Sequence, residues 1–578
     1  MTLYSRPTCS ICFHQLFHMR GHDQPRGTAA YSCPAGTHCK MGDSWSPSVL
    51  QEGITRRNSS KGDTGADGTP VAKDGSSAIK DGNTVPTCAV EAKCADGTVP
   101  LQKQVGLFGG TALLIGCVIG SGIFVTPSVV YREAGSVGMD LIIWGLGGLI
   151  SLLGGLCYAE LGSLLPASGG DYAYLCAAGK VLPRCSGVGA FLSAWAQSTV
   201  TDPVGAATQG LAFASYVLKP IYHTCNPPYL AVTLVAATFI GLTTFINCIS
   251  TKVSARVQDL LSSIKCLVLI SIILTAAVLS YRVNHLTDVP LFANTNKDPG
   301  RITLAIYGAL FSYSGWKYVN FVAAEMTDPH RQLPRVIAAG LLTVTVIYIL
   351  TNVAYFLCLD GQEMLRSEAV AVSFAQATWG VKAAILVPVF VSISAFGCAC
   401  AASFCSSRVV LAAARQGHLP RFLSYVHAES AVPLSSTIVR GFLGVVYAVF
   451  AGSLDALIEA GVFIDSIFDV LGVVSLFVLR HTMKETPRAY KVPIVIAVVR
   501  LLIGMGLVVI PLVSAARYTP YILVLLILGA GMIYYWLFVH LKLRLPGSDA
   551  FNIFVQKVLF SAPCANELED ILAVNKVL

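Results

Sequence analysis

Apolar segments recur along this chain from about residue 106 to residue 541, separated by short stretches that contain Pro, Gly and charged residues. Most are long enough to cross a bilayer as a helix, which takes roughly 20 apolar residues. The pattern therefore predicts an all-α membrane protein with twelve transmembrane helices. We place these spans near residues 106–130, 138–164, 189–218, 229–250, 258–281, 302–324, 336–359, 383–410, 433–452, 455–479, 493–514 and 519–541.

The first apolar segment contains a run of small residues, Gly116-Cys-Val-Ile-Gly-Ser-Gly-Ile-Phe124, with three glycines among seven residues. We expect the helix to be interrupted here. In hydrocarbon, an interrupted helix is tolerated only where its freed N–H and C=O groups face protein, a water-filled cavity or a ligand. The alternative is a seam of small residues that lets two helices approach closely.

A second interruption is expected in the sixth segment, where Phe311-Ser-Tyr-Ser-Gly-Trp316 places small and hydrogen-bonding residues in mid-span. Spans one and six are the first members of two five-span halves. Paired interruptions at corresponding positions indicate a transporter site at the interface between two repeats. The sequence thus favours a five-plus-five inverted repeat with two extra C-terminal spans, and packing glycines alone become the weaker explanation.

Composition agrees with this class of protein and divides the chain into three parts. Hydrophobic residues make up 54% and charged residues 12% of the chain, which excludes a soluble domain and a wholly disordered chain. Residues 1–104 are polar and lack a hydrophobic period, so we expect a disordered N-terminal tail. Residues 105–545 form the transporter domain and 546–578 a C-terminal tail. Lys and Arg are more frequent in the even-numbered loops, which predicts that both termini are cytoplasmic.

Motifs for other functions are missing from the sequence. The Gly179-Lys180 pair lacks the rest of a phosphate-binding loop, and no zinc-protease or serine-hydrolase motif occurs. We therefore expect neither an ATP-driven pump nor an enzyme. The net charge of +8 is spread through the loops, so no nucleic-acid partner is indicated. Four zinc-type ligands near the start, Cys9, Cys12, His14 and His18, are too tightly spaced for a usual finger, and we expect no metal and no cofactor.

Several sequence motifs, in order, resemble those of the amino acid permease superfamily. They are Val118-Ile-Gly-Ser-Gly-Ile-Phe-Val-Thr-Pro127, Ala159-Glu-Leu-Gly162, Ser168-Gly-Gly-Asp-Tyr172, Phe311-Ser-Tyr-Ser-Gly-Trp-Lys-Tyr-Val-Asn-Phe321, Asp328-Pro-His-Arg-Gln-Leu-Pro334 and Ala413-Ala-Arg-Gln-Gly-His-Leu-Pro420. The resemblance covers roughly residues 105 to 545. Within the superfamily, the motifs most resemble those of the light subunits of heteromeric amino acid transporters, and among these the aromatic-preferring member. The resemblance implies a leucine-transporter-type fold.

The interruptions would bind the two charged groups of a free amino acid. Backbone N–H groups freed at Gly120, Ser121 and Gly122 would bind the carboxylate, and Ile119 with carbonyls in the second break would bind the ammonium. By resemblance, Phe311 would close over the substrate from outside, although it could instead face lipid or core. The substrate-binding candidates are Ile119, Gly120, Ser121, Gly122, Ile123, Asp202, Phe311, Ser312, Ser314, Gly315 and Lys317.

Lys265 lies among apolar residues in the fifth span. A buried ammonium is costly, so it either reaches the membrane surface or has a function. The resemblance implies that this lysine replaces the sodium ion of related transporters and that transport is sodium-independent.

Cys225 lies in the loop between spans three and four, which the topology places outside the cell, and an unpaired cysteine there suggests an intermolecular disulfide. The resemblance implies a bond to a single-span glycoprotein heavy subunit. The Asn-x-Ser/Thr site at Asn58 lies in the tail, so no outer loop can carry an N-linked glycan. That absence fits a chain that travels with a glycosylated partner, and a free Cys225 is the alternative.

Two residues depart from the family pattern. Asp202 stands where many relatives have a basic residue, and Lys317 stands where many have Asn. The two could pair across the site and leave it neutral, which would suit an apolar or aromatic substrate side chain. Alternatively, an unpaired Lys317 would favour acidic substrates, an unpaired Asp202 would favour cationic ones, or both lie away from the substrate.

Together these features predict a sodium-independent, obligatory exchanger of neutral, and within that class aromatic, L-amino acids. It would lie in the plasma membrane in contact with lipid as the light subunit of a disulfide-linked heterodimer. The alternatives are an exchanger of acidic or cationic amino acids, a relative that has lost transport, or a channel, which would need a continuous polar stripe or charged rings.

Overall fold

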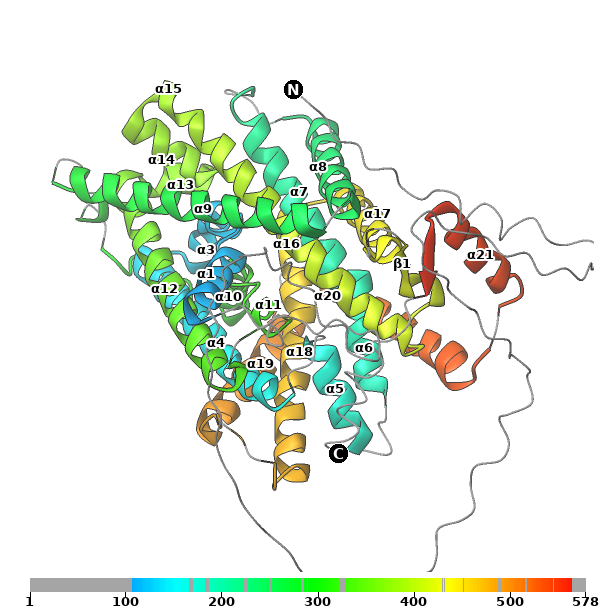
Figure 1. Cartoon of the computed structure of the whole chain (residues 1–578). Helices are drawn as coiled ribbons and strands as arrows, with labels where there is room; N and C mark the ends of the chain where they lie inside the picture. Colours follow the sequence, from blue (N-terminus) through cyan, green and yellow to red (C-terminus); the bar gives the residue numbers. More distant parts are fainter. Residues whose placement is uncertain are drawn as a thin grey trace, which may run out of the picture. The chain divides into compact units, whose positions relative to one another are not determined.

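A computed structural model of the chain describes residues 106–563 apart from short gaps at 166–169, 182–186, 223–226, 250, 282–284, 288–289, 322–325, 327, 368, 429, 431, 451, 487, 489, 515–516 and 544. The described part is almost entirely helical (Figure 1). Cys225 and the N-terminal tail lie outside the described residues.

The first half of the bundle begins with an interrupted helix. Its elements are α1 (Leu107–Val118), α2 (Gly122–Val125), α3 (Pro127–Ala134), α4 (Val137–Leu164), α5 (Gly170–Val181), α6 (Val188–Ala196), α7 (Asp202–Leu218), α8 (Tyr229–Ile249) and α9 (Thr251–Leu279). A π-helical turn at Gln197–Thr201 joins α6 to α7.

The second half begins with the other interrupted helix. Its elements are α10 (Pro299–Ser312), α11 (Tyr318–Phe321), α12 (Pro329–Cys358), α13 (Gly361–Arg366), α14 (Val370–Trp379), α15 (Val381–Ala384), α16 (Leu386–Arg415), α17 (Leu434–Phe450), α18 (Leu454–Thr482), α19 (Ile494–Ser514), α20 (Thr519–Tyr534) and α21 (Ser548–Val558). Two short strands, β1 (Tyr425–His427) and β2 (Ser561–Pro563), pair antiparallel.

Helices occupy every one of the apolar segments identified in the sequence. Within the described residues, 8 helices are long and apolar enough by themselves to cross a membrane. The helix over Ile264–Leu279 and α17 are shorter apolar helices, and the third and sixth segments are divided by a π-helical turn and by the second interruption. The α-helices missing from the sequence prediction are α5, α13 to α15 and α21, which connect or follow the apolar segments, and the strands β1 and β2 were not predicted either.

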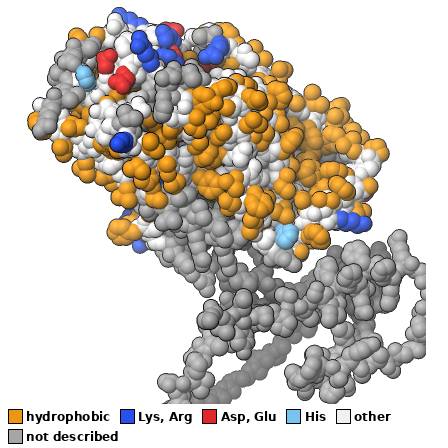
Figure 2. Space-filling view, turned by 90° about the horizontal axis from the view of Figure 1, so that it is seen from above, with side chains coloured by type: hydrophobic (Ala, Val, Ile, Leu, Met, Phe, Trp, Pro, Cys, Tyr) orange, Lys and Arg blue, Asp and Glu red, His pale blue; other side chains and the backbone are white. Residues whose placement is uncertain are grey.

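The outer surface of the bundle is apolar. Figure 2 shows a broad face of hydrophobic side chains, with the Lys, Arg, Asp and Glu side chains away from its middle. Leu234 on α8, Leu274 on α9, Leu502 on α19 and Leu526 on α20 are all exposed. Such a large continuous apolar surface is stable against lipid hydrocarbon and would aggregate in water.

Helix α4 contacts α12 through glycines, which lets the two backbones approach closely. A Cβ added at Gly148 would collide with Thr345, and one added at Gly155 would lie 2.5 Å from Ile337. Small residues at helix contacts are the usual packing device in membranes, where the hydrophobic effect gives no preference for helix over lipid. Helix α4 therefore has a seam of small residues that lets two helices approach closely, the type of packing that was the alternative explanation for the glycines of the first interruption.

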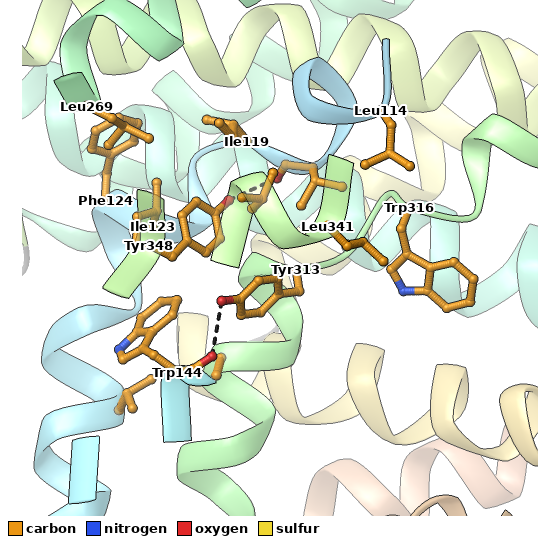
Figure 3. Packing of buried hydrophobic residues seen from close by; sticks show 14 of the residues in the cluster. Leu114, Ile119, Ile123, Phe124, Trp144, Leu269, Tyr313, Trp316, Leu341 and Tyr348 are labelled. Carbon is orange, nitrogen blue, oxygen red and sulfur yellow. Dashed lines mark hydrogen bonds between the residues drawn. The ribbon is translucent and has the colours of Figure 1, made fainter. Parts of the chain in front are cut away.

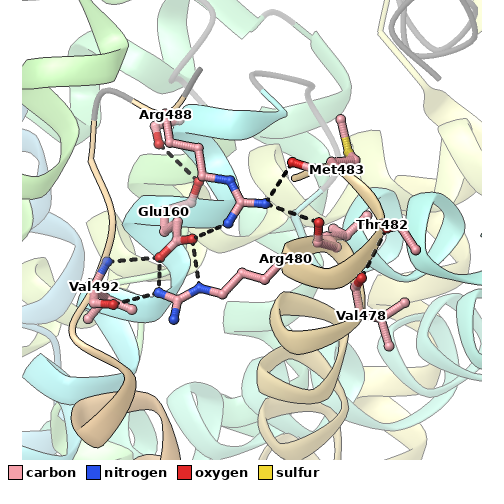
Figure 4. A network of polar contacts seen from close by, with 9 residues as sticks. Glu160, Val478, Arg480, Thr482, Met483, Arg488 and Val492 are labelled. Carbon is pink, nitrogen blue, oxygen red and sulfur yellow. Dashed lines mark hydrogen bonds and ion pairs between the residues drawn. The ribbon is translucent and has the colours of Figure 1, made fainter. Parts of the chain in front are cut away.

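One end of the bundle is joined by an ion-pair network around Glu160 at the end of α4, which is fully buried (Figure 4). Arg480 on α18 bonds both carboxylate oxygens, and Arg488 donates to Oε1 at 3.0 Å. The backbone N–H of Val492 donates to Oε2 at 2.8 Å. Removing one partner of a buried ion pair costs about 3–5 kcal/mol, so this network holds α4, α18 and the segment before α19 together.

Candidate functional site

The first interruption lies where the sequence predicts it. Helix α1 ends at Val118, the backbone of Ile119 is extended (φ −70°, ψ 97°), and α2 begins at Gly122. The structure provides no intramolecular acceptor, within the described part of the chain, for the backbone N–H of Gly120 or Ser121. Two adjacent peptide donors are therefore available inside an apolar bundle, where an unbonded N–H is costly.

The second interruption packs directly against the first. Gly315 has φ +97°, in the region that favours glycine, and a Cβ added there would lie 2.7 Å from the carbonyl oxygen of Cys117. A Cβ at Gly122 would lie 2.7 Å from the Cα of Ser312. At these positions the glycines do serve close packing, as the alternative explanation proposed, and the two surfaces that they bring together are the two breaks themselves.

Three side chains satisfy backbone and hydroxyl groups at the interruptions. The Tyr348 hydroxyl on α12 lies 3.2 Å from the carbonyl oxygen of Val118 and 3.0 Å from that of Ser312, and its position between the breaks is visible in Figure 3. The Thr126 and Ser312 hydroxyls are 2.7 Å apart and bond each other. The breaks are therefore fixed to each other and to α12.

Lys265 on α9 reaches the same region. Its ammonium donates to the carbonyl oxygen of Gly116 at 3.0 Å, and the residue is 1% exposed. An ammonium this deeply buried does not extend to the membrane surface. It supplies a positive charge at the C-terminal end of α1, where the helix dipole is negative.

The interruptions border a cavity of about 190 Å³. Its walls include nine of the predicted site residues: Gly120, Ser121, Gly122, Asp202, Phe311, Ser312, Ser314, Gly315 and Lys317. The other two, Ile119 and Ile123, are fully buried in a hydrophobic core cluster and are not among the cavity's lining residues. Their side chains pack, so any contribution of Ile119 would come from its backbone.

Lys317 and Asp202 both line this cavity, but the ion pair considered as one possibility from the sequence does not form between them. Among the described residues, Lys317 pairs with Asp171 on α5 at 3.1 Å and with Asp469 on α18 at 2.5 Å. Asp202 accepts a hydrogen bond from Gln197 at 2.6 Å. Lys317 follows the second break and already has two carboxylates in reach, whereas Asp202 begins α7 beside its own π-helical turn.

The contacts of Asp469 extend the charged cluster to α19. Its second oxygen accepts a hydrogen bond from Arg500 at 2.6 Å. Asp171, Lys317, Asp469 and Arg500 thus form a chain of alternating charge along one wall of the cavity. Alternation of this kind compensates charges that would be prohibitively costly to bury singly.

Helix α5 is held in place by the segment that follows α16. The Tyr172 hydroxyl donates to Gln416 at 2.7 Å and lies 3.0 Å from Nδ1 of His418. Burial lowers the pKa of the His418 imidazole, which favours the neutral ring as a hydrogen-bond partner at physiological pH. This contact fixes the helix that carries Asp171.

Sequence reasoning missed Asp171, Asp469, Arg500 and Tyr348. Asp469 and Arg500 are ionisable residues inside apolar segments, and such residues mark functional positions by default. Asp171 lies in the Ser168-Gly-Gly-Asp-Tyr172 motif and carried a detectable signal as well. Tyr348 had none, because a tyrosine in an apolar span is indistinguishable by sequence from a packing aromatic.

Most of the chain is similar in sequence to known amino acid transporters. Residues 105–537 match the family model described as amino acid permease. The chain is 36% identical over 450 residues to the human b(0,+)-type amino acid transporter 1, covering 77% of this chain and 90% of that protein. It is 37% identical over 427 residues to the rabbit large neutral amino acids transporter small subunit 2, covering 73% of this chain and 78% of that protein.

Replacing Gly315 by Ala tests the close contact between the two interruptions. We expect Gly315→Ala to lower the free energy of unfolding by about 1–2 kcal/mol for the left-handed backbone and by roughly 1–3 kcal/mol more for the steric overlap with Cys117. Gly417→Ala is the matched control, because Gly417 also has a positive φ (+76°) but open space around it. The measurement is thermal unfolding of the two detergent-purified variants, and equal losses would contradict the close contact.

Proposed function

Because the chain belongs to the amino acid permease family, we propose that it exchanges neutral L-amino acids, aromatic ones among them, across the plasma membrane without sodium. The observation that carries this proposal is the meeting of two interrupted helices at one cavity. A free amino acid presents a carboxylate and an ammonium that must both be desolvated, and preorganised backbone groups replace that water at low cost.

The first break supplies the carboxylate site in this proposal. The N–H groups of Gly120 and Ser121 have no acceptor among the described residues, and a carboxylate is the acceptor that makes the strongest hydrogen bonds to them. Carbonyl oxygens of Ser314 in the second break and of Ile119 bind the ammonium. The Phe311 carbonyl already accepts from the N–H of Ser314 and the Ser312 carbonyl from Tyr348, which leaves these two a secondary role. Phe311, half-buried in the cavity wall, closes over the substrate.

Lys265 removes the need for a sodium ion. Its ammonium donates to the backbone carbonyl at the end of α1, the kind of group that coordinates a metal cation in interrupted helices. A permanently tethered charge performs this task in every cycle, and transport is therefore independent of external sodium.

Alternating access follows from a twelve-span, five-plus-five inverted-repeat fold of the leucine-transporter type, with both termini in the cytoplasm. The Glu160 network lies at the cytoplasmic end. At the other end, Arg132 on α3 pairs with Asp455 on α18 at 2.7 Å, and Glu133 pairs with Arg301 on α10 at 3.0 Å. These two sets of contacts tie opposite ends of the moving helices and open in turn.

The compensated cluster of Asp171, Lys317, Asp469 and Arg500 favours a substrate side chain without charge. One observation supports a second candidate, the exchange of cationic amino acids. The cavity walls also contain Asp202 and Asp465 against a single further cation, Arg440, and Oδ2 of the buried Asp202 has no hydrogen-bond partner among the described residues. The acidic-substrate alternative loses its support, because Lys317 is paired.

The chain is proposed to act as a light subunit joined through Cys225 to a glycoprotein heavy subunit. The support is the position of this cysteine in a predicted outer loop without a glycosylation sequence, and the name of the rabbit relative, which is a transporter small subunit. Transport is proposed to belong to this subunit, because both interrupted helices and the cavity that they border are formed by this chain.

Filling the first break with a larger side chain tests the site. A Cβ at Gly120 lies 3.1 Å from Sγ of Cys398, so the remainder of a Leu side chain must enter the cavity. We expect Gly120→Leu to reduce uptake of every substrate by about tenfold to hundredfold, measured with radiolabelled amino acids at equal surface expression. Gly241→Leu, on the exposed side of α8 with open space around it, controls for the added side chain. Unchanged uptake by Gly120→Leu would contradict the proposal that substrate binds at the first interruption.

The partner is tested by electrophoresis of the chain purified from animal cells. Without reductant we expect a band well above the chain's own 61.3 kDa, which reductant and Cys225→Ser both abolish. Cys358→Ser is the matched control, because Cys358 is buried near the end of α12 and should not affect the band. A high-mass band that survives Cys225→Ser would exclude the proposed disulfide.

A further inference from the structure

The ammonium of Lys317 is enclosed by groups that recognise cations. It lies 3.1 Å from Asp171 and 2.5 Å from Asp469. It also lies 5.5 Å from the ring centroid of Tyr158 and 5.8 Å from that of Trp316. Two carboxylates and two aromatic rings around one ammonium are the components of a cation-binding site.

The walls of this site are held independently of Lys317. Asp469 is positioned by Arg500 at its other oxygen, and Tyr158 packs edge-on against Trp316 with ring centroids 5.2 Å apart. Lys317 bonds Oδ2 of Asp171, and Oδ1 of the same carboxylate has no hydrogen-bond partner among the described residues. If the Lys317 side chain were removed, the two carboxylates and the two rings would still form a cation site, and that site would be empty.

Lys317 also belongs to the cavity that the interruptions border. It follows Gly315 by two residues, and both line the same space as Gly120 and Asp202. Its side chain is 23% exposed, so it is accessible from the cavity. A substrate bound at the breaks would extend its side chain into a space where this ammonium already neutralises the nearest carboxylates.

We propose that Lys317 is a tethered occupant of a cation site in the substrate cavity and that it makes the cavity discriminate against amino acids with cationic side chains. This inference rests on the proposed function and specifies the substrate class of the same site. A tethered ammonium competes at a high effective concentration, so a free lysine or ornithine side chain gains little from Asp171 and Asp469.

Charge in the cavity wall supports the same conclusion. The lining acids are Asp171, Asp202, Asp465 and Asp469, and the lining bases are Lys317, Arg440 and Arg500. The lining carries one more acid than base with Lys317 present and two more without it. Loss of Lys317 therefore strengthens the field that attracts a cation at the point where the freed carboxylates lie.

The test is the binding of L-lysine and L-norleucine to the full-length protein in detergent, measured by ligand-dependent thermal stabilisation. The two ligands differ by one ammonium group. We expect Lys317→Met to raise the ratio of lysine affinity to norleucine affinity by about tenfold to hundredfold, the range expected for a hydrogen-bonded ion pair. An unchanged ratio would overturn the proposal. Lys382→Met makes the same substitution at an exposed site outside the cavity and should leave the ratio unchanged.

Two further variants connect the effect to the carboxylates. Lys317→Arg keeps the cation and should retain the wild-type ratio. Lys317→Met combined with Asp469→Asn removes one charge of each sign and should return the ratio toward wild type. A ratio that stays as high in the double variant as in Lys317→Met would show that Asp469 contributes nothing to the gain, and would contradict the proposal that both carboxylates form the site.

Asp171→Asn tests the same site if Lys317→Met does not fold. Here the ammonium remains with one carboxylate fewer, and we expect the affinity for L-glutamate relative to L-norleucine to rise. No rise would count against the tethered cation. Because these assays measure binding, a chain that transported no amino acid would disprove the proposed exchange, while the affinity ratios would still decide the role of Lys317.

Discussion

Backbone groups released from two interrupted helices must find partners inside an apolar bundle, and this requirement determines most of the central architecture. Tyr348 reaches carbonyl oxygens in both breaks, and Lys265 bonds the last turn of α1. Gly122 and Gly315 allow the two breaks to touch. At the first break, the N–H groups of Gly120 and Ser121 still have no acceptor among the described residues. A ligand with a carboxylate would complete the set, so the cost of breaking the helices is offset when the site is filled.

The charged residues along the cavity wall next to the breaks also need partners inside the apolar bundle. No single charge could be buried there cheaply, and the structure alternates acid and base from Asp171 to Arg500. The same alternation governs selectivity, because every cation already in place reduces what a cationic substrate can gain. A transporter of this design can therefore change its substrate range by changing one internal ion rather than the breaks that hold the amino acid backbone.

The apolar segments were enough to locate the long helices, since twenty-residue apolar segments have few other folds available in a bilayer. They gave no indication of α5, α13 to α15 or α21. The interruptions were equally visible, because glycine runs are unusual inside such segments. The Asp202–Lys317 pair failed for a physical reason. Sequence shows which residues depart from a pattern, but an ammonium goes to the nearest carboxylates in space, and those lie on α5 and α18. Tyr348 could not be distinguished from a packing aromatic, and the assignment of Ile119 and Ile123 overlooked that their side chains pack in the core while the adjacent glycines border the cavity.

The measurement that tests the central claim most directly is uptake of a radiolabelled amino acid panel by purified protein in proteoliposomes, with and without sodium and with unlabelled substrate inside. A site formed by two broken helices, with Lys265 in place of a metal ion, predicts uptake of neutral and aromatic amino acids that is unaffected by sodium and increased by internal substrate. Uptake that required sodium, or that no internal substrate could increase, would contradict the account.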